Sequence, residues 1–407
     1  MARDRLAWPI VEERAYFDHA ASTSMVPAAR EAWLRQSALL GNPSSLHASG
    51  RHRRQVVEES REQIADLLGT RPSAVVFTSG GTESDNLAVK GLFWGARRRR
   101  GASRIAVSTV EHHAVLDPVL WLEQEQQATV DWIGVDPLGR IEVDVLAGVL
   151  RDADDIALCT VMWANNEIGT IQPVERIAAM CRDAGVPFHT DAVQVLGHVP
   201  MDLDRLGATA VTLSSHKIGG PFGAGALVLD PQASVDPVLH GGGQEREVRS
   251  GTVDAPAIAG FAAAVAHAVA GQRDRAVALL DLRERLIRGL VDSVPGVVIN
   301  GDRGTGPQDR LPGNVHASFP GCEGDLLLML LDAAGIDCST GSACTAGIPE
   351  PSHVLLALGR DEAAARSSLR FSMSESTTQQ EVDRLLAAVP LAVDRASRAG
   401  SITTRAV

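Results

Sequence analysis

Three short stretches of the sequence combine residues that could perform chemistry with glycines that leave room around them. The stretch "SSHKIGG" places Lys217 after a strand-like run, and "HTDAVQ" places Asp191 at the end of another such run. The stretch "FTSGGTE" carries Gly81 and Thr82 between a strand-like run and a helical pattern, with Thr82 as a suitable N-cap. A helix N-terminus that follows glycines can bind an anion such as a phosphate, although an ordinary capped turn looks the same.

The combination of these stretches is more informative than any one of them. Asp191 by itself would be a common helix N-cap, and Lys217 by itself a surface lysine in a glycine-rich turn. One strand–helix–strand unit fits between the two residues, so they can be neighbours at the same edge of a sheet. A phosphate site, an acid for a ring nitrogen and a lysine that forms a Schiff base are together what pyridoxal 5′-phosphate (PLP) requires. On this interpretation Ser214 and His216 are ligands of the phosphate.

A fourth stretch, "STGSACTAG", places Cys344 among small residues. Structural cysteines usually have apolar neighbours, whereas this thiol is expected on an exposed loop, where it could be a nucleophile. The five cysteines contain no C-x-x-C pair, which predicts reduced thiols and neither disulfides nor a metal site. Cys159 and Cys181 lie in apolar patterns and are expected to be buried, whereas Cys322 and Cys338 could be partly exposed.

Length and composition limit the class of protein. The 407 residues are 45% hydrophobic with a formal net charge of −12, so the chain can bury a large core and lacks the basic character of nucleic-acid-binding proteins. The one basic block, Arg97–Arg100, is expected to be a solvated helix C-terminus. No apolar run approaches the ~18 residues of a membrane helix, and the first residues lack a signal-peptide core. We therefore expect a cytoplasmic protein without membrane contacts.

Between about residues 70 and 230, short β-branched runs alternate with helical patterns. This alternation predicts a mostly parallel sheet that is covered by helices on both faces and binds ligands at the carboxyl ends of its strands. We expect an α/β fold with a large domain over residues 15–265 and a smaller α/β domain over residues 266–407, with which residues 1–14 pack. The runs that predict strands are "SAVVFTS", "RIAVST", "ATVDWIGV", "DIALCTVMWA", "VPFHTDA", "ATAVTLSS" and "GALVLD".

Eight motifs occur in the order seen in cysteine desulfurases, and the chain therefore resembles this group of PLP enzymes within the class V aminotransferases. The resemblance covers roughly residues 15 to 395. It implies the PLP-dependent transferase fold type I, with a mostly parallel seven-stranded sheet, L-cysteine as substrate and a homodimer. The motifs are "TSGGTESDNLAVKG", "EHHAVLDP", "NNEIGTIQP", "HTDAVQVLG", "SSHKIGGPFGAGAL", "GGGQEREVRSGT", "STGSACTAG" and "RSSLRFSMS".

The resemblance also implies roles for residues around the cofactor. Lys217 holds PLP as a Schiff base, and Asp191 pairs with the pyridinium. His112 stacks on the ring and can relay protons. Gln194 binds the 3′-oxygen of the cofactor, and Asn166 contacts that oxygen or the substrate carboxylate.

Two further residues are implied in contacts to the substrate and to a partner subunit. Arg370 forks onto the substrate α-carboxylate, a geometry that suits guanidinium. Thr252 reaches the phosphate of the partner subunit's cofactor. The chain departs from the family pattern at Glu247, where glycine is common, and at Ser374–Glu375, where a Gly-containing turn is typical. We expect these departures to change local contacts more than activity.

The implied activity converts L-cysteine to L-alanine and forms a persulfide on Cys344. Lys217 removes the α-proton, and a long catalytic loop between Cys344 and Arg370 carries sulfur to an acceptor, such as an iron–sulfur cluster scaffold or a tRNA-thiolating enzyme. Two alternatives remain open. The first is another PLP enzyme of this scaffold, such as a selenocysteine lyase or an aminotransferase, although an aminotransferase has no need for Cys344. A catalytically silent partner in a sulfur-transfer complex is the other, and it would have no use for Lys217 or Asp191.

Overall fold

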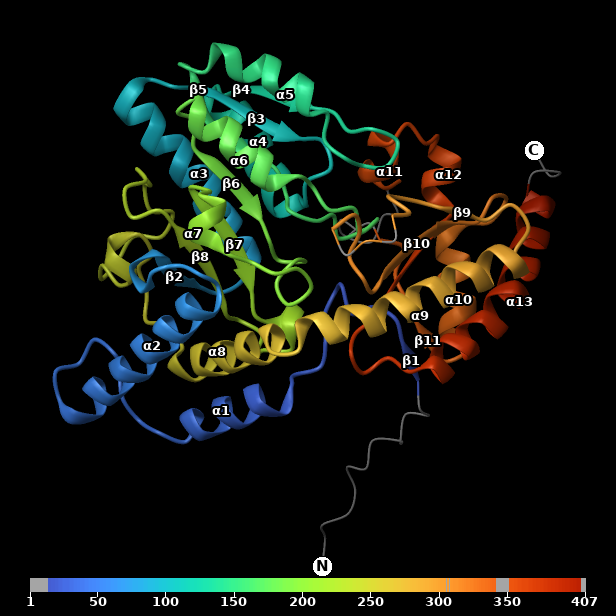
Figure 1. Ribbon diagram of the computed structural model, residues 1–407, viewed down its shortest axis with the longest axis horizontal. Helices are drawn as coiled ribbons and strands as arrows, with labels where there is room; N and C mark the ends of the chain where they lie inside the picture. The colour runs from blue at the N-terminus through green and yellow to red at the C-terminus, as the bar shows by residue number, and fades with distance from the viewer. Residues whose placement is uncertain (1–13, 305, 307, 342–350, 404–407) are drawn as a thin grey trace, which may run out of the picture.

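The computed structural model describes residues 14–304, 306, 308–341 and 351–403, and its larger part is built around one sheet (Figure 1). The strand order is β2-β8-β7-β6-β5-β3-β4; β8 runs antiparallel to both neighbours and the other pairs are parallel. The predicted mostly parallel, seven-stranded sheet is confirmed. The strands are β2 (Val75–Thr78), β3 (Arg104–Ser108), β4 (Thr129–Ile133), β5 (Ile156–Thr160), β6 (Phe188–Asp191), β7 (Ala210–Ser214) and β8 (Gly225–Leu229).

Helices cover both faces of this sheet. Every residue of β2, β5, β6, β7 and β8 is buried, as expected for strands enclosed between two helical layers. One layer contains α3 (Gly81–Arg100) and α4 (His113–Gln126), which share a hydrophobic cluster with the sheet. A second cluster joins the sheet to the remaining helices of this part: α1 (Pro27–Ser37), α2 (Ala48–Leu67), α5 (Val143–Val149), α6 (Val174–Asp183), α7 (Leu203–Leu206) and α8 (Ala255–Val269).

A separate hydrophobic core surrounds a smaller sheet. The antiparallel strands β9 (Val298–Ile299), β10 (Asn314–Ser318) and β12 (Ser368–Ser372) pack with α9 (Gln272–Ser293), α10 (Gly324–Ala333) and α13 (Gln379–Thr403). The short helices α11 (His353–Ala357) and α12 (Glu362–Arg366) precede β12. At the start of the chain, β1 (Ala15–Tyr16) pairs in parallel with β11 (Ile336–Asp337), and Ala15 and Phe17 pack into this smaller core. The exact domain boundaries stay a prediction.

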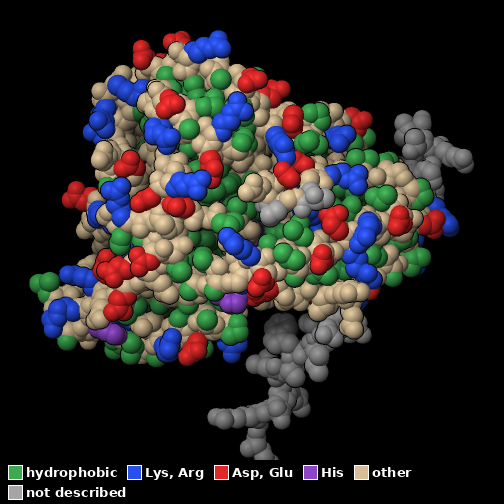
Figure 2. Space-filling model, in the orientation of Figure 1, with side chains coloured by type: hydrophobic (Ala, Val, Ile, Leu, Met, Phe, Trp, Pro, Cys, Tyr) green, Lys and Arg blue, Asp and Glu red, His purple; other side chains and the backbone are tan. Residues whose placement is uncertain are grey.

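The surface carries charges of both signs. Acidic and basic side chains are interspersed on the face shown in Figure 2. Arg97–Arg100 form the last turn of α3 and are exposed, as expected; Arg98 pairs with Asp236, and Arg100 donates to the backbone oxygen of Asp154 at 2.9 Å. In the described part of the chain no single helix could cross a membrane by length and composition, although α8 and α9 pass that test jointly across a 70° bend.

The segment that contains Glu247 is held by a buried ion pair. Arg61 Nη2 lies 2.7 Å from Glu245 Oε1, and both side chains are 5% exposed. Glu245 also accepts a hydrogen bond from the backbone nitrogen of Phe77 at 2.8 Å, which fixes the segment to β2. Two residues later, Glu247 has a φ of +64°, in the left-handed region that favours glycine. A glutamate adopts this backbone conformation only at a cost, so a glycine would suit the position better.

Replacing Glu247 by glycine is expected to raise the free energy of unfolding by about 0.5–1 kcal/mol, because glycine adopts the left-handed region without steric strain. The thermal midpoint of unfolding measures the change. Glu62→Gly is a matched control, since Glu62 is an exposed position inside α2, where glycine should cost about 1 kcal/mol. A Glu247→Gly protein as destabilised as this control would show that the backbone at residue 247 is not strained.

Candidate active site

A cavity of about 380 Å³ lies at the carboxyl edge of the seven-stranded sheet. Asp191 is the last residue of β6 and Ser214 the last of β7, whereas Arg370 comes from β12 of the smaller core. The cavity is therefore lined by residues of both cores. The residues singled out from the sequence that line it are Gly81, Thr82, His112, Asn166, Asp191, Gln194, Ser214, His216, Lys217 and Arg370.

The wall between α3 and the end of β7 suits a phosphate group. Helix α3 begins at Gly81, and its N-cap is Gly80, which has no side chain to satisfy the first backbone N–H groups. Thr82, expected at the N-cap, lies inside the first turn instead. Within the described part of the chain, Ser214 Oγ and His216 Nδ1 are buried without a hydrogen-bond partner. Free N–H groups and unsatisfied side-chain atoms around one wall are what a bound phosphate would satisfy.

Lys217 lies in a short 3₁₀ turn directly after this wall. Its Nζ donates hydrogen bonds to the backbone oxygens of Ala20 at 2.7 Å and Ala21 at 2.9 Å. Burial lowers the pKa of Lys217 to about 8, and the positive charge of Arg370 lowers it further. An amine with this pKa is partly uncharged near neutral pH, which is the form that attacks a carbonyl carbon.

Asp191 and His112 lie on the same cavity with opposite shifts in pKa. Burial raises the pKa of Asp191 to about 7, with a further contribution from the charge of Asp85. Asp191 Oδ1 accepts a hydrogen bond from the backbone nitrogen of Val193 at 2.9 Å. Burial lowers the pKa of His112 to about 4, so the ring is neutral at physiological pH. Its Nδ1 accepts from the backbone nitrogen of Ala114 at 3.1 Å, which assigns the ring proton to Nε2.

Arg370 is buried at the junction of the two cores. Its Nη2 lies 2.6 Å from Asp18 Oδ1, and its Nη1 donates to the backbone oxygen of Asn166 at 3.0 Å. Among the described residues, the third donor, Nε, is buried without a partner. An unsatisfied donor on a guanidinium that lines the cavity can receive a carboxylate oxygen.

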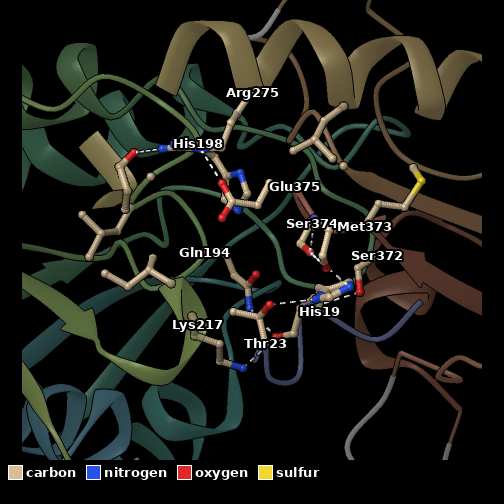
Figure 3. Close-up of a pocket in the computed structure, with 18 of the residues that line it drawn as sticks. His19, Thr23, Gln194, His198, Lys217, Arg275, Ser372, Met373, Ser374 and Glu375 are labelled. Carbon is tan, nitrogen blue, oxygen red and sulfur yellow. Dashed lines mark hydrogen bonds and ion pairs between the residues drawn. The ribbon is translucent and has the colours of Figure 1, made fainter. Parts of the chain in front are cut away.

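A second cavity of about 240 Å³ adjoins the first and shares Lys217 and Gln194 with it (Figure 3). The turn that departs from the family pattern lines this second cavity. Glu375 Oε1 lies 2.7 Å from His267 Nε2, and Oε2 lies 3.4 Å from Arg275 Nε. Glu375 thus forms a local cluster with a hydrogen bond to His267 and an ion pair to Arg275.

Two buried acids of the site were missed by sequence reasoning. Asp85 lines the first cavity and is one helical turn after Gly81 on α3, a spacing that could have indicated the same helix face. Glu111 is fully buried next to His112, and its Oε1 accepts from the backbone nitrogen of Met162 at 2.6 Å. In the described structure, Asp85 Oδ1 and Glu111 Oε2 have no hydrogen-bond partner.

Two residues singled out from the sequence are not brought to the cavity. Thr252 is exposed and lines a separate cavity of about 170 Å³, together with Gln244 and Glu245. Its contact with a partner subunit stays a prediction. Cys344 and residues 345–350 of the expected catalytic loop lie outside the described residues. The rest of the segment before Arg370 is described and contains the short helices α11 and α12, where a loop was expected. No group of three or more His, Cys, Asp and Glu side chains that could hold a metal ion occurs within the described ranges.

A sequence profile described as Aminotransferase class-V matches residues 15–385. The chain belongs to the class-V aminotransferase family. It is 50% identical over 386 residues to the "IscS-like cysteine desulfurase" of Mycobacterium tuberculosis, covering 95% of this chain and 98% of that protein. "Cysteine desulfurase IscS" of Methanosarcina thermophila is 41% identical over 391 residues, which cover 96% of this chain and 94% of that protein. The resemblance to cysteine desulfurases is confirmed.

Solved structures confirm the fold. A "NifS-like protein" superposes with a TM-score of 0.85 at 33% identity, covering 94% of this chain and 99% of that one. A structure titled "SspA in complex with cysteine" gives a TM-score of 0.75 at 33% identity, covering 89% of this chain and all of that one. Members of this family depend on PLP, and the phosphate wall, Asp191 and Lys217 of this chain suit that cofactor.

In cofactor-free protein, labelling of Lys217 by reductive methylation should rise as the pH increases through about 8, because only the uncharged amine reacts. Peptide mass analysis at a series of pH values measures the fraction of Lys217 that is labelled. Lys90, the only other lysine in the sequence, is a control on the same chain. Arg370→Gln should move the midpoint of Lys217 upward, since it removes a nearby positive charge. A wild-type midpoint near 10.4, the ordinary value for lysine, would contradict the effect of burial.

Arg370→Ala is expected to raise the KM for L-cysteine about tenfold or more, because a charged hydrogen bond to a carboxylate is worth roughly 1.5–3 kcal/mol. The PLP content of the purified protein should stay unchanged. Arg366→Ala serves as the control, since Arg366 forms a surface pair with Glu362 at 2.9 Å. An unchanged KM in Arg370→Ala would place the carboxylate site elsewhere.

Proposed function

We propose that this protein acts as a PLP-dependent cysteine desulfurase that converts L-cysteine to L-alanine and forms a persulfide on Cys344. The observation that carries the proposal is the single cavity in which a phosphate wall, the Lys217 amine and the Arg370 guanidinium face one another. The names of the relatives agree with this activity, and one structural neighbour is described with cysteine bound. These names favour a desulfurase over an aminotransferase, a selenocysteine lyase or a silent partner.

Each residue of the cavity has a separate role toward the cofactor or the substrate. When bound, PLP supplies an acceptor for the electron pair left at Cα. Asp191 holds the proton of the ring nitrogen, and Lys217, with its lowered pKa, takes the proton from Cα. Arg370 binds the substrate carboxylate through its unsatisfied Nε and so orients Cα toward Lys217. The neutral imidazole of His112 can pass a proton within the cavity.

Transfer of sulfur needs no external oxidant or reductant. The thiolate of Cys344 attacks the substrate sulfur, so a sulfur–sulfur bond forms and the carbon–sulfur bond breaks. The electron pair of the broken bond stays with carbon, which takes a proton and becomes the methyl group of L-alanine. The sulfur is oxidised by two electrons and the carbon is reduced by two, so the step balances.

The four described cysteines are poor candidates for this nucleophile. Cys159 and Cys181 are buried, as expected. Cys322, which could have been partly exposed, is also buried, because its turn packs into the smaller core and its Sγ lies 3.8 Å from the backbone oxygen of Val393 on α13. Cys338 is partly exposed, but burial of its thiol and the nearby Asp18 carboxylate raise its pKa to about 12. A thiolate is therefore disfavoured at Cys338, and the other three described thiols are buried.

The setting in the cell forms a further part of the proposal. We infer a cytoplasmic homodimer in which Thr252 of one subunit reaches the phosphate site of its partner; the exposed position of Thr252, away from its own cavity, supports this. The sulfur would pass to iron–sulfur cluster scaffolds or to tRNA-thiolating enzymes. The IscS names of the relatives support the former. The net charge of −12 supports acceptors that are proteins and not nucleic acids.

After incubation with L-cysteine and alkylation, peptide mass analysis should find the additional sulfur on Cys344. Cys344→Ser should abolish sulfide release and leave the visible spectrum of the bound cofactor unchanged. Cys338→Ser is the matched control and should keep most of the activity, because its thiol stays protonated. Persulfide on Cys338, or sulfide release at the wild-type rate by Cys344→Ser, would refute the assignment of the nucleophile.

A further inference from the structure

An ion pair joins the first turn of α3 to a segment far away in the chain. Arg249 Nε lies 2.7 Å from Glu83 Oε1, and Arg249 Nη2 lies 3.2 Å from Glu83 Oε2, so the guanidinium binds both carboxylate oxygens. The two side chains are 15% and 18% exposed. Glu83 is the third residue of α3, directly after Gly81 and Thr82, which line the cofactor cavity. The ion pair therefore lies beside the phosphate wall.

Glu83 holds the turn that precedes the helix. Its Oε2 accepts hydrogen bonds from the backbone nitrogen of Ser79, at 2.8 Å, and from the Oγ of the same residue. Burial alone would raise the pKa of Glu83, but the hydrogen bonds from Arg249 and Ser79 outweigh burial and lower the pKa, so the group is a carboxylate near neutral pH. Because these bonds go to a residue ahead of the helix, the first backbone N–H groups of α3 stay available for an anion.

A carboxylate and a phosphate would compete for the same end of this helix. The N-terminus of a helix is the positive end of its dipole, which attracts either anion. Two negative charges at a partly buried site also repel each other, because water screens them poorly. Glu83 thus favours the turn but disfavours a phosphate bound next to it. A cation that binds both oxygens of Glu83 removes this repulsion while the turn stays fixed.

The segment that carries Arg249 is held along β2, the strand that leads into the turn. Arg246 Nη2 donates to a backbone oxygen of β2 at 2.8 Å, and Glu245 Oε2 accepts from a backbone nitrogen of the same strand at 2.8 Å. The three residues Glu245–Glu247 have φ angles of 45°, 58° and 64°, all in the left-handed region. Such a strained backbone persists only where its surroundings hold it. These contacts therefore fix the position of Arg249 opposite Glu83.

We propose that Arg249 is a positioning residue for the cofactor phosphate: it neutralises Glu83, so that this carboxylate fixes the turn before α3 without repelling a phosphate at the helix N-terminus. The pyridine ring should be unaffected, because its expected partners Asp191 and Lys217 lie on other elements. The role goes beyond the proposed function. It depends on PLP as the cofactor and not on the transfer of sulfur to Cys344.

The test measures the dissociation constants of PLP and of pyridoxal, which lacks the phosphate, from cofactor-free protein. Arg249→Gln removes the positive charge and keeps a side-chain donor. Its affinity for PLP should fall about fivefold or more, because the charge of Glu83 is left uncompensated near the phosphate. Its affinity for pyridoxal should stay within about twofold of the wild-type value, because this ligand has no phosphate to repel.

Removing the carboxylate separates the effect of charge from that of structure. Glu83→Gln breaks the same ion pair, but its amide oxygen can still accept from Ser79, so its affinity for PLP should stay within about twofold of the wild type. The double variant Arg249→Gln/Glu83→Gln should recover the affinity that Arg249→Gln loses. Arg98→Gln is the matched control and should leave both affinities unchanged, since Arg98 pairs with Asp236 in the last turn of the same helix.

Three results would overturn the proposal. Arg249→Gln could keep its affinity for PLP, or it could lose affinity for PLP and pyridoxal equally, which would mean that Arg249 acts only on the fold. Glu83→Gln could lose as much affinity for PLP as Arg249→Gln, which would mean that the ion pair and not the charge of Glu83 matters. Glu83→Gln tests the proposal by itself if Arg249→Gln does not fold. Cys344→Ser should keep the wild-type affinity for PLP, so a failure of sulfur transfer is distinguishable from a failure at this ion pair.

Discussion

Burial of ionisable groups at the carboxyl edge of the seven-stranded sheet is the constraint on which the site depends. Helical layers enclose the strands on both faces, so the side chains that follow β6 and β7 leave water as the chain folds. Burial is the largest cause of the shift in pKa at Asp191, Lys217 and His112, and in each case it favours the uncharged form. Near neutral pH, Asp191 and Lys217 are therefore close to their pKa values, and His112 is neutral.

Arg370 lies where the two cores meet. It comes from β12 of the smaller core and pairs with Asp18, which forms a bridge with Ser372 of the same strand. Its Nη1 also donates to the backbone oxygen of Asn166 on the larger core. The same charge contributes to the lowered pKa of Lys217. Any movement that separates the cores would take the carboxylate-binding group away from the cavity. The same movement would let the pKa of Lys217 rise. Packing between the cores thus controls both substrate binding and the reactivity of the amine.

The sequence could predict those features that depend on contacts between residues close together in the chain. Strand-like runs and the residues that end them depend on neighbours in the chain, so Asp191, Ser214 and Lys217 could be placed at one sheet edge in advance. The position of Asp85 at the cavity could not be predicted, because it depends on packing of α3 against the sheet, where its Oδ1 lies 3.5 Å from Nε2 of His189 on β6.

Errors in the prediction follow the same rule. Thr82 was expected at the N-cap, but the N-cap is Gly80 and the helix begins two residues earlier, a difference that backbone geometry decides. Cys322 lies in a turn that looks exposed in the sequence, but Val393 of α13, 71 residues later, covers it.

The choice between lysine and arginine in this chain also reflects the need for a basic group that can lose its proton. Of its 38 lysines and arginines, only Lys90 and Lys217 are lysines. Arginine forms the ion pairs of the surface and of the buried segment at Glu245, where a permanent charge and several donors are useful. A guanidinium stays charged even when it is buried, so it cannot become the neutral nucleophile that a Schiff base requires. An ammonium can lose its proton, and burial beside Arg370 brings that loss to about pH 8. Most cations in this chain are arginines. The lysine at residue 217 is explained by the need for a basic group that can lose its proton.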